Sequence, residues 1–225
     1  MKDRFAHMIV LAASAALILS SCGLSRPPKQ TVNYYTLGYA VPQFADMERV
    51  PLIVRVARFS EAADNNLSQM LFSPGPDVRN EYFYERWRAM PGDLASSFLL
   101  RDMQQCGLFT AAVGGDSTAS ANFRVEGRVE KFYELDLPDA WEADLSITVT
   151  LLRENPNSTS RLVVFQKTYD HSEKAAVKSP QAVAEAMSRA MAAVSRSIIA
   201  DIHSAGRDLE PGKAAKANPP KEGPK

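Results

Sequence analysis

The sequence predicts an α+β domain, in which a mainly antiparallel β-sheet is covered on one face by two α-helices. Three segments in its second half alternate apolar and polar side chains, as strands with one buried face do. Two other segments carry apolar residues three or four positions apart, as amphipathic helices do. The alternating segments are joined by connections too short for parallel crossovers, which favours an antiparallel meander.

The composition is that of one folded domain. The chain has 225 residues, of which 45% are apolar and 23% charged, and these fractions are ordinary for globular domains. Its 26 Lys and Arg balance 26 Asp and Glu, so no basic surface points to nucleic acid. Two cysteines, Cys22 and Cys106, are too few for a disulfide-stapled miniprotein or a Cys-x-x-Cys zinc site.

Residues 1–21 are predicted to form an export signal. Lys2 and Arg4 precede an apolar run, Met8 to Leu19, which is too short to cross a bilayer core of roughly 30 Å. The run ends in Leu19-Ser20-Ser21-Cys22, which resembles the bacterial lipobox. In that class the cysteine thiol receives diacylglycerol and the chain is cut just before it, so Cys22 becomes the lipidated first residue. The alternative is an ordinary signal peptide followed by an unrelated cysteine.

The mature chain divides by composition into a tether, a domain and a tail. Residues 22–32 contain Pro27 and Pro28 and suit an extended lipidated tether. Residues 207–225 are rich in Pro and Lys and have too little apolar surface to fold, so they are predicted to be a disordered tail. The folded domain is therefore predicted at 33–206.

In the first half of the domain, short strands precede a helix. Asn33 to Leu37 and Leu52 to Phe59 are rich in aromatic and β-branched residues. Glu81 to Arg88 is a short aromatic segment, which we interpret as a strand paired with Met70 to Ser73. Pro91-Gly92-Asp93 opens a helix with Asp93 as its N-cap residue. Its apolar face is predicted to consist of Ala95, Leu99, Met103 and Cys106, with Gly107 after its end.

The meander and a long helix make up the second half. The predicted strands are 123–130, 144–151 and 161–169, and Asn155 to Ser158 forms a turn. The helix is predicted from Pro180 to Ser204, with Gly206 stopping it. Its apolar stripe comprises Val183, Met187, Ala190, Val194, Ile198 and Ile202.

These features together resemble the ABC-type transport auxiliary lipoproteins, which accompany MCE-domain lipid transporters. The matching residues are Cys22, the opening Tyr34-Tyr35-Thr36-Leu37, the strand Leu52 to Phe59, and Tyr84-Glu85-Arg86-Trp87 followed by Met90-Pro91. The resemblance implies an accessory role in moving phospholipids or other hydrophobic molecules between two membranes. Its implied partners are an MCE-domain protein and the permease and ATPase of an ABC transporter. The implied address is the periplasmic leaflet of a Gram-negative outer membrane, which Gly23 after the lipidated cysteine also favours.

Tyr84, Arg86 and Trp87 are the candidate partner-binding residues, because aromatic side chains and arginine dominate protein interfaces. The structural alternative is that Trp87 fastens the first helix to the sheet and that Arg86 pairs with Glu81 or Glu85.

The sequence predicts no catalytic, cofactor or metal site, and we expect no enzyme. The histidines outside the signal, His171 and His203, are interpreted as surface residues, because neither lies beside a nucleophile motif. The leading hypothesis is a lipid-anchored adaptor, and the alternative is a periplasmic lipid carrier with an internal pocket. Oligomeric state stays open, a homo-oligomer included.

Overall fold

The computed structural model describes residues 30–155 and 158–208. Contacts divide the chain into Met1–Thr31 and Val32–Lys225, and all elements below belong to the second unit. Cys22, most of the tether, the centre of the predicted 155–158 turn and the tail from 209 onward lie outside the described residues. The elements are β1 Asn33–Tyr35, β2 Val50–Val56, β3 Ser60–Glu61, the 3₁₀ turn η1 Ala63–Asn65, β4 Gln69–Gly75, β5 Val78–Trp87, α2 Pro91–Gln105, β6 Phe109–Gly114, β7 Phe123–Asp136, β8 Trp141–Asn155, β9 Ser158–Lys174 and α3 Pro180–Asp208.

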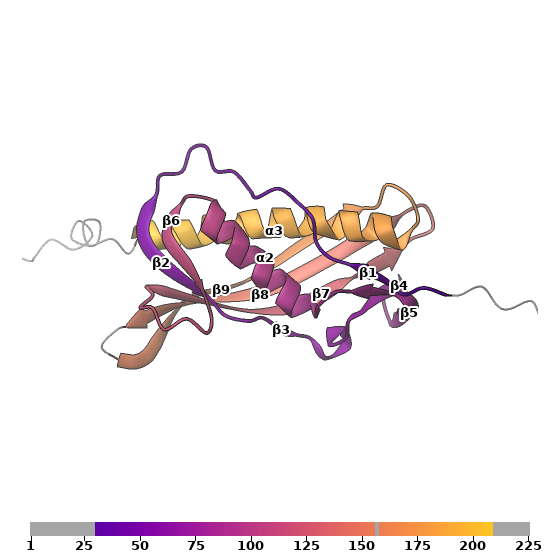
Figure 1. Ribbon diagram of the computed structural model, residues 1–225, viewed down its shortest axis with the longest axis horizontal. Helices are drawn as coiled ribbons and strands as arrows, with labels where there is room; N and C mark the ends of the chain where they lie inside the picture. The colour runs from indigo at the N-terminus through magenta and orange to yellow at the C-terminus, as the bar shows by residue number, and fades with distance from the viewer. Residues whose placement is uncertain (1–29, 156–157, 209–225) are drawn as a thin grey trace, which may run out of the picture. The chain divides into compact units, whose positions relative to one another are not determined.

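The predicted α+β class is confirmed: the described strands form one curled sheet, and two long helices pack against it (Figure 1). On one side of β7 lie β8 and then β9, which together form the predicted antiparallel meander. Along the other side of β7 lie β2, β3 and β4, all parallel to it. Beyond them β6 pairs parallel with β2, β5 pairs antiparallel with β4, and β1 pairs parallel with β5.

The parallel pairings were not expected from the sequence. The parallel pairing of β6 with β2 arises because α2 carries the chain back across the sheet, so that β6 returns in the direction of β2. The antiparallel ladders between β7, β8 and β9 nevertheless hold most of the paired residues.

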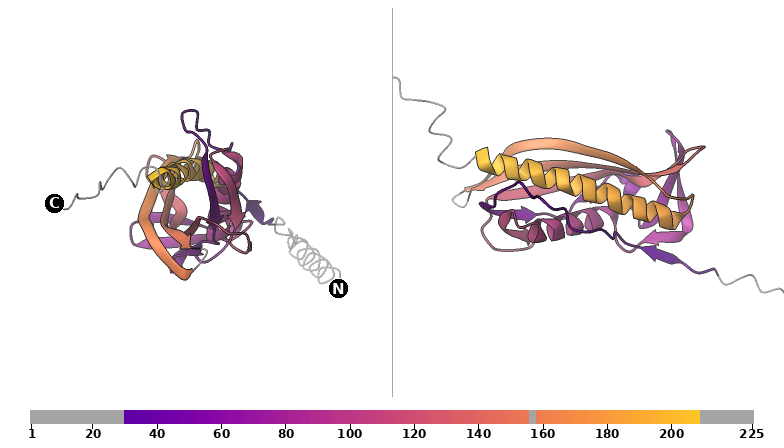
Figure 2. Two further views of the ribbon diagram at one scale, coloured as in Figure 1. Left: turned by 90° about the vertical axis from the view of Figure 1, so that its left-hand side faces the viewer. Right: turned by 90° about the horizontal axis from the view of Figure 1, so that it is seen from above.

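The core lies between the meander and α3. The inward residues Leu145, Ile147, Val149 and Leu151 of β8 are fully buried, and every residue of the predicted α3 stripe is at most 2% exposed. Figure 2 shows α3 running along the inner face of the curled strands. Burying a large aliphatic side chain contributes about 1.5–3 kcal/mol, so this interface is the main source of stability.

A β-bulge in β7 changes which side chains face that core. Val129 pairs with Ile147, yet Lys131 pairs with Ser146, so β7 carries one extra residue at this point. Before the bulge the odd-numbered residues face inward, and after it Phe132 and Glu134 do, each 1% exposed. An insertion of one residue reverses the two faces of a strand. The bulge therefore places a carboxylic acid among apolar side chains.

Two helix ends differ from the sequence-based expectation. Asp93 is not the N-cap of α2: the cap is Met90, which makes no side-chain capping bond. Instead Glu61 accepts the backbone N–H of Gly92 at 3.0 Å, and Asp93 pairs with Arg58. Glu61 of β3 therefore caps the N-terminus of α2.

Gly206 does not end α3, which continues to Asp208. A Cβ atom on Gly206 would collide with Leu52 Cδ1. The glycine serves close packing of the helix against β2. Gly107, by contrast, has the positive φ of 77° expected of a residue just after a helix.

Candidate functional site

Strand β5 contains a bulge of several residues opposite β4. Gln69 pairs with Arg86 and Leu71 pairs with Glu81, so β4 advances by two residues while β5 advances by five. The three extra residues lie within Tyr82-Phe83-Tyr84-Glu85, which we call the aromatic bulge. Ladder pairing is interrupted there, which frees the side chains from regular alternation.

Tyr82 ties the aromatic bulge to the core. Its hydroxyl donates to the Glu134 carboxyl group, lying 3.0 and 3.2 Å from the two oxygens, and its ring packs against Phe72 at 4.8 Å between centroids. Burial raises the pKa of Glu134 to about 7; the Tyr82 hydrogen bond and Lys178 oppose this rise, whereas Asp136 adds to it. Burial and the same carboxyl group raise the pKa of Tyr82, so its hydroxyl stays a donor.

Strand β1 holds the other end of the aromatic bulge. Asn33 pairs in register with Glu85, and its side-chain amide donates to Glu85 at 3.1 Å. The Tyr35 hydroxyl donates to the other Glu85 oxygen at 2.7 Å. Burial, assisted by Glu85, raises the pKa of Tyr35 to about 12, so this hydrogen bond persists at any physiological pH. Glu85 is therefore oriented by two donors from the first strand of the domain.

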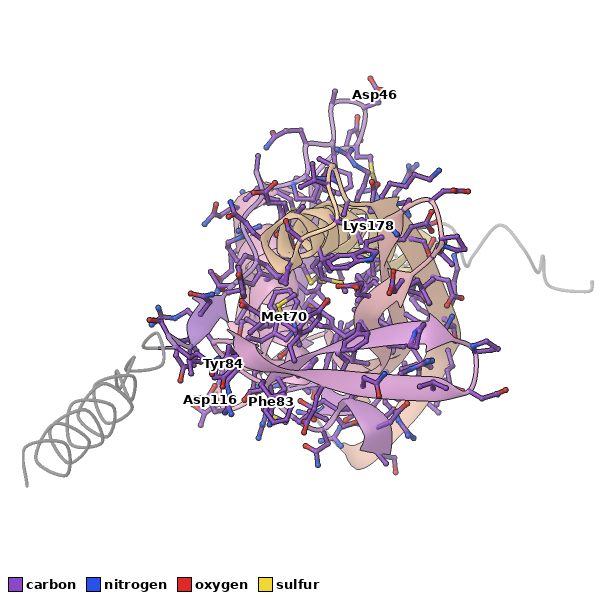
Figure 3. All side chains as sticks on the ribbon, turned by 90° about the vertical axis from the view of Figure 1, so that its right-hand side faces the viewer. Asp46, Met70, Phe83, Tyr84, Asp116 and Lys178 are labelled. Carbon is purple, nitrogen blue, oxygen red and sulfur yellow. The ribbon has the colours of Figure 1, made fainter. Side chains whose placement is uncertain are left out.

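Between these two fixed ends, the other aromatic rings point to solvent. Phe83 is 82% exposed and Tyr84 is 42% exposed, and their rings lie 6.3 Å apart. Figure 3 shows them side by side at the margin of the unit, whereas Met70 lies inside it, opposite the aromatic bulge. An open groove of about 630 Å³ lies beside them, lined by Phe72, Asn80, Glu81, Tyr82, Phe83, Tyr84 and Glu85. Exposed aromatic clusters of this kind are typical of interaction sites.

The three predicted partner-binding residues lie in different environments. Tyr84 is on the surface and lines the groove. Trp87 is only 2% exposed, and its ring packs edge-to-face on Phe132 at 4.9 Å. It belongs to the core, and its ring contact is with β7 rather than with the first helix of the alternative. Arg86 is half-buried, and its Nε has no hydrogen-bond partner within the described residues. The ion pair considered for it with Glu81 or Glu85 does not form in that part of the chain.

The histidines and Cys106 make contacts within the fold. His171 lies on β9 with Nε2 3.0 Å from a Glu173 oxygen. His203 is not a surface residue: it is 2% exposed on α3, and its Nε2 donates to the Glu48 carbonyl at 2.7 Å. Cys106 is half-buried rather than fully buried. Burial raises the pKa of its thiol, whose hydrogen points to the Met103 carbonyl.

Across residues 30–155 and 158–208, no cluster of three or more His, Cys, Asp or Glu side chains has an arrangement that would hold a metal ion. In the same part of the chain, no helix combines the length and apolar character needed to cross a bilayer.

Sequence reasoning missed Phe83 and Glu134. For Phe83 the signal was present, because Tyr82-Phe83-Tyr84 is a run of three aromatic residues. Consecutive side chains of a regular strand point to opposite faces of the sheet, so all three rings cannot lie on the same buried face. For Glu134 there was no signal, because its burial depends on the bulge in β7.

No protein-family model matches the chain, and no curated protein matches it. Its fold is similar to that of a Xanthomonas campestris protein described as DUF330, with a TM-score of 0.71 and 17% sequence identity, over 79% of this chain and 98% of that one. It is also similar to the solved structure of an uncharacterised protein, with a TM-score of 0.58 and 12% identity, over 76% of this chain and 99% of that one. At these identities the likeness establishes a shared fold.

Proposed function

We propose that this protein is a lipid-anchored periplasmic adaptor, which docks an ABC transporter of the MCE type that moves phospholipids or other hydrophobic molecules between the inner and outer membranes. The observation that carries the proposal is a well-packed core combined with an exposed aromatic surface that hydrogen bonds hold at both ends. In this proposal the protein performs no catalysis, and its role is to bind and position the MCE-domain component.

The anchor and the aromatic bulge fit one arrangement. The lipobox ends at Cys22, and Asn33 of β1 lies eleven positions further along the chain. A fully extended chain of that length spans at most about 40 Å. Since β1 pairs directly with β5, lipidation of Cys22 would keep the aromatic bulge within this distance of the bilayer surface. The proposed location is the periplasmic leaflet of the outer membrane.

The hydrogen bonds at both ends of the aromatic bulge favour recognition of a protein. The aromatic bulge is held by Glu134 at one end and by Tyr35 at the other. A surface held in its binding conformation loses little entropy on association. Aromatic rings presented in this way are the usual anchors of protein interfaces.

The lipid-carrier alternative requires space between helix and sheet. There the side chains of α3 and β8 are packed against each other with almost no exposure, and the groove beside the aromatic bulge is open rather than enclosed. These observations favour the adaptor.

Two experiments test the adaptor. In vivo crosslinking from the aromatic bulge, followed by purification of the tagged protein, is expected to recover an MCE-domain protein. The Cys22→Ala variant is expected to leave the outer-membrane fraction and to lose metabolic palmitate labelling. Unchanged fractionation of Cys22→Ala would remove the proposed anchor, and co-purification of lipid without any transporter component would favour the carrier.

A further inference from the structure

The groove beside the aromatic bulge combines aromatic walls with carboxylates. Four of its seven lining residues are aromatic: Phe72, Tyr82, Phe83 and Tyr84. Two others, Glu81 and Glu85, are acidic, and the lining contains no Lys or Arg. The local charge of the groove is therefore negative, although the whole chain is neutral.

Both carboxylates are able to receive a cation. Glu81 is exposed, and within the described residues no hydrogen bond or ion pair engages its side chain. Glu85 is oriented by Tyr35 and Asn33. Both of these partners are neutral, so the charge of Glu85 stays uncompensated.

The two arginines of β5, Arg79 and Arg86, do not line this groove. Arg79 lies over the Tyr133 ring, with Cζ 3.9 Å from the centroid, and donates to the Tyr133 hydroxyl at 2.7 Å. Arg86 is half-buried and does not line the groove. The carboxylates of Glu81 and Glu85 are therefore available to a positively charged group of a partner.

We propose that this groove binds an arginine side chain on an extended segment of the partner protein, an inference that rests on the proposed adaptor role. A guanidinium group stacks on aromatic faces and pairs with carboxylates through a planar set of donors. Phe83 and Tyr84 offer the ring faces, and Glu81 and Glu85 offer the acceptors. A phospholipid phosphate or a fatty-acid carboxylate would instead be repelled by these two glutamates.

The probe is a short fluorescein-labelled peptide in which arginine and serine alternate, compared with a counterpart that has glutamine in place of each arginine. Binding to the full-length protein in detergent is measured by fluorescence anisotropy at low ionic strength. We expect the arginine peptide to bind about tenfold more tightly than its counterpart.

Variants separate the groove from general charge. Glu81→Gln combined with Glu85→Gln is expected to weaken binding of the arginine peptide about fivefold, and Phe83→Ala about threefold. Asp46→Asn removes one carboxylate from the loop before β2, well away from Phe83 in Figure 3, and is expected to change nothing. Thermal unfolding of each variant checks that the fold is retained.

Equal binding of the two peptides would overturn the inference, and so would an Asp46→Asn loss as large as that of the double variant. If crosslinking recovers an MCE-domain protein while the glutamate variants bind the peptide normally, the adaptor stands and the arginine site fails. If the peptide requires Glu81 and Glu85 but no transporter component is recovered, the site stands and the adaptor role fails.

Discussion

Phe132 and Phe83 show two opposite uses of the same side chain. Phe132 belongs to the meander region and is 1% exposed, packed against Trp87. Phe83 belongs to the aromatic bulge and is 82% exposed. In the first region a one-residue bulge in β7 turns Phe132 into the core, after which the pairing with β8 continues in register. In the second region three extra residues in β5 interrupt the pairing, and Phe83 stays outside the core. The comparison teaches that side chains of the meander are used to stabilise the fold, whereas the aromatic bulge leaves a large apolar ring in solvent, where the proposed partner could reach it.

Truncating the buried ring should have the largest effect on stability. Phe132→Ala removes the edge-to-face partner of Trp87 and leaves a cavity, so the free energy of unfolding is expected to fall by about 3–5 kcal/mol. Chemical denaturation followed by tryptophan fluorescence measures this. A loss below about 1 kcal/mol would mean that the region is loosely packed and that the contrast with Phe83 is weaker than described.

Overpacking the meander should have the next largest effect. A Cβ atom on Gly127 would lie 2.6 Å from the nearest atom of the Phe59 ring, which is itself 1% exposed. Gly127→Ala is therefore expected to lower the free energy of unfolding by about 1–3 kcal/mol. Gly75→Ala, where a Cβ would meet nothing within 4 Å, is the matched control, and equal losses in the two variants would contradict the steric explanation.

The junction between the two regions should respond to pH. Burial raises the pKa of Glu134 from 4.5 to about 7, so the folded protein holds this proton more tightly than the unfolded chain does. The resulting stabilisation is fully present below pH 4.5 and is lost as the pH rises through about 7. Relative to Glu134→Gln, the wild-type protein is expected to lose about 1–2 kcal/mol between pH 5 and pH 8.

Denaturation curves of both proteins at the two pH values measure this difference. The glutamine keeps an oxygen that can accept the Tyr82 hydrogen bond, so the comparison isolates the charge. A constant difference between the two proteins would show that Glu134 does not titrate in this range.

Truncating the exposed ring should have the smallest effect on stability. Phe83→Ala is expected to change the free energy of unfolding by less than about 0.5 kcal/mol, because the side chain is already in water. The same variant should reduce crosslinking to the transporter component. Asp46→Asn is the surface control. A large stability loss in Phe83→Ala would show that the aromatic bulge serves folding rather than binding.

The sequence predicted the regular parts of this fold well. Alternation in β7 and β8 and the stripe on α3 depend on periodicity, which is a local property of the chain. The end of α3 was missed because Gly206 is accommodated against Leu52, a residue far away in the sequence. The cap of α2 was missed for the same reason, since the acceptor is Glu61 on β3.

The candidate site was only partly predictable. Tyr84 could be chosen from its residue type, and the aromatic run around it was visible. Whether Trp87 or Phe83 would face solvent depended on the number of residues that β5 inserts opposite Met70. The number of inserted residues is set by the pairing of β5 with β4, and the sequence of β5 alone does not indicate it.

The length of α3 has a practical consequence. Strand β1 and the yellow end of α3 lie at opposite ends of the described fold in Figure 1, and β1 is the strand next to the aromatic bulge. An affinity handle or fluorescent reporter fused after the last helix would start far from the proposed docking surface. Such a fusion is the one least able to obstruct capture of the partner, whereas an insertion ahead of β1 would sit beside the rings it is meant to study.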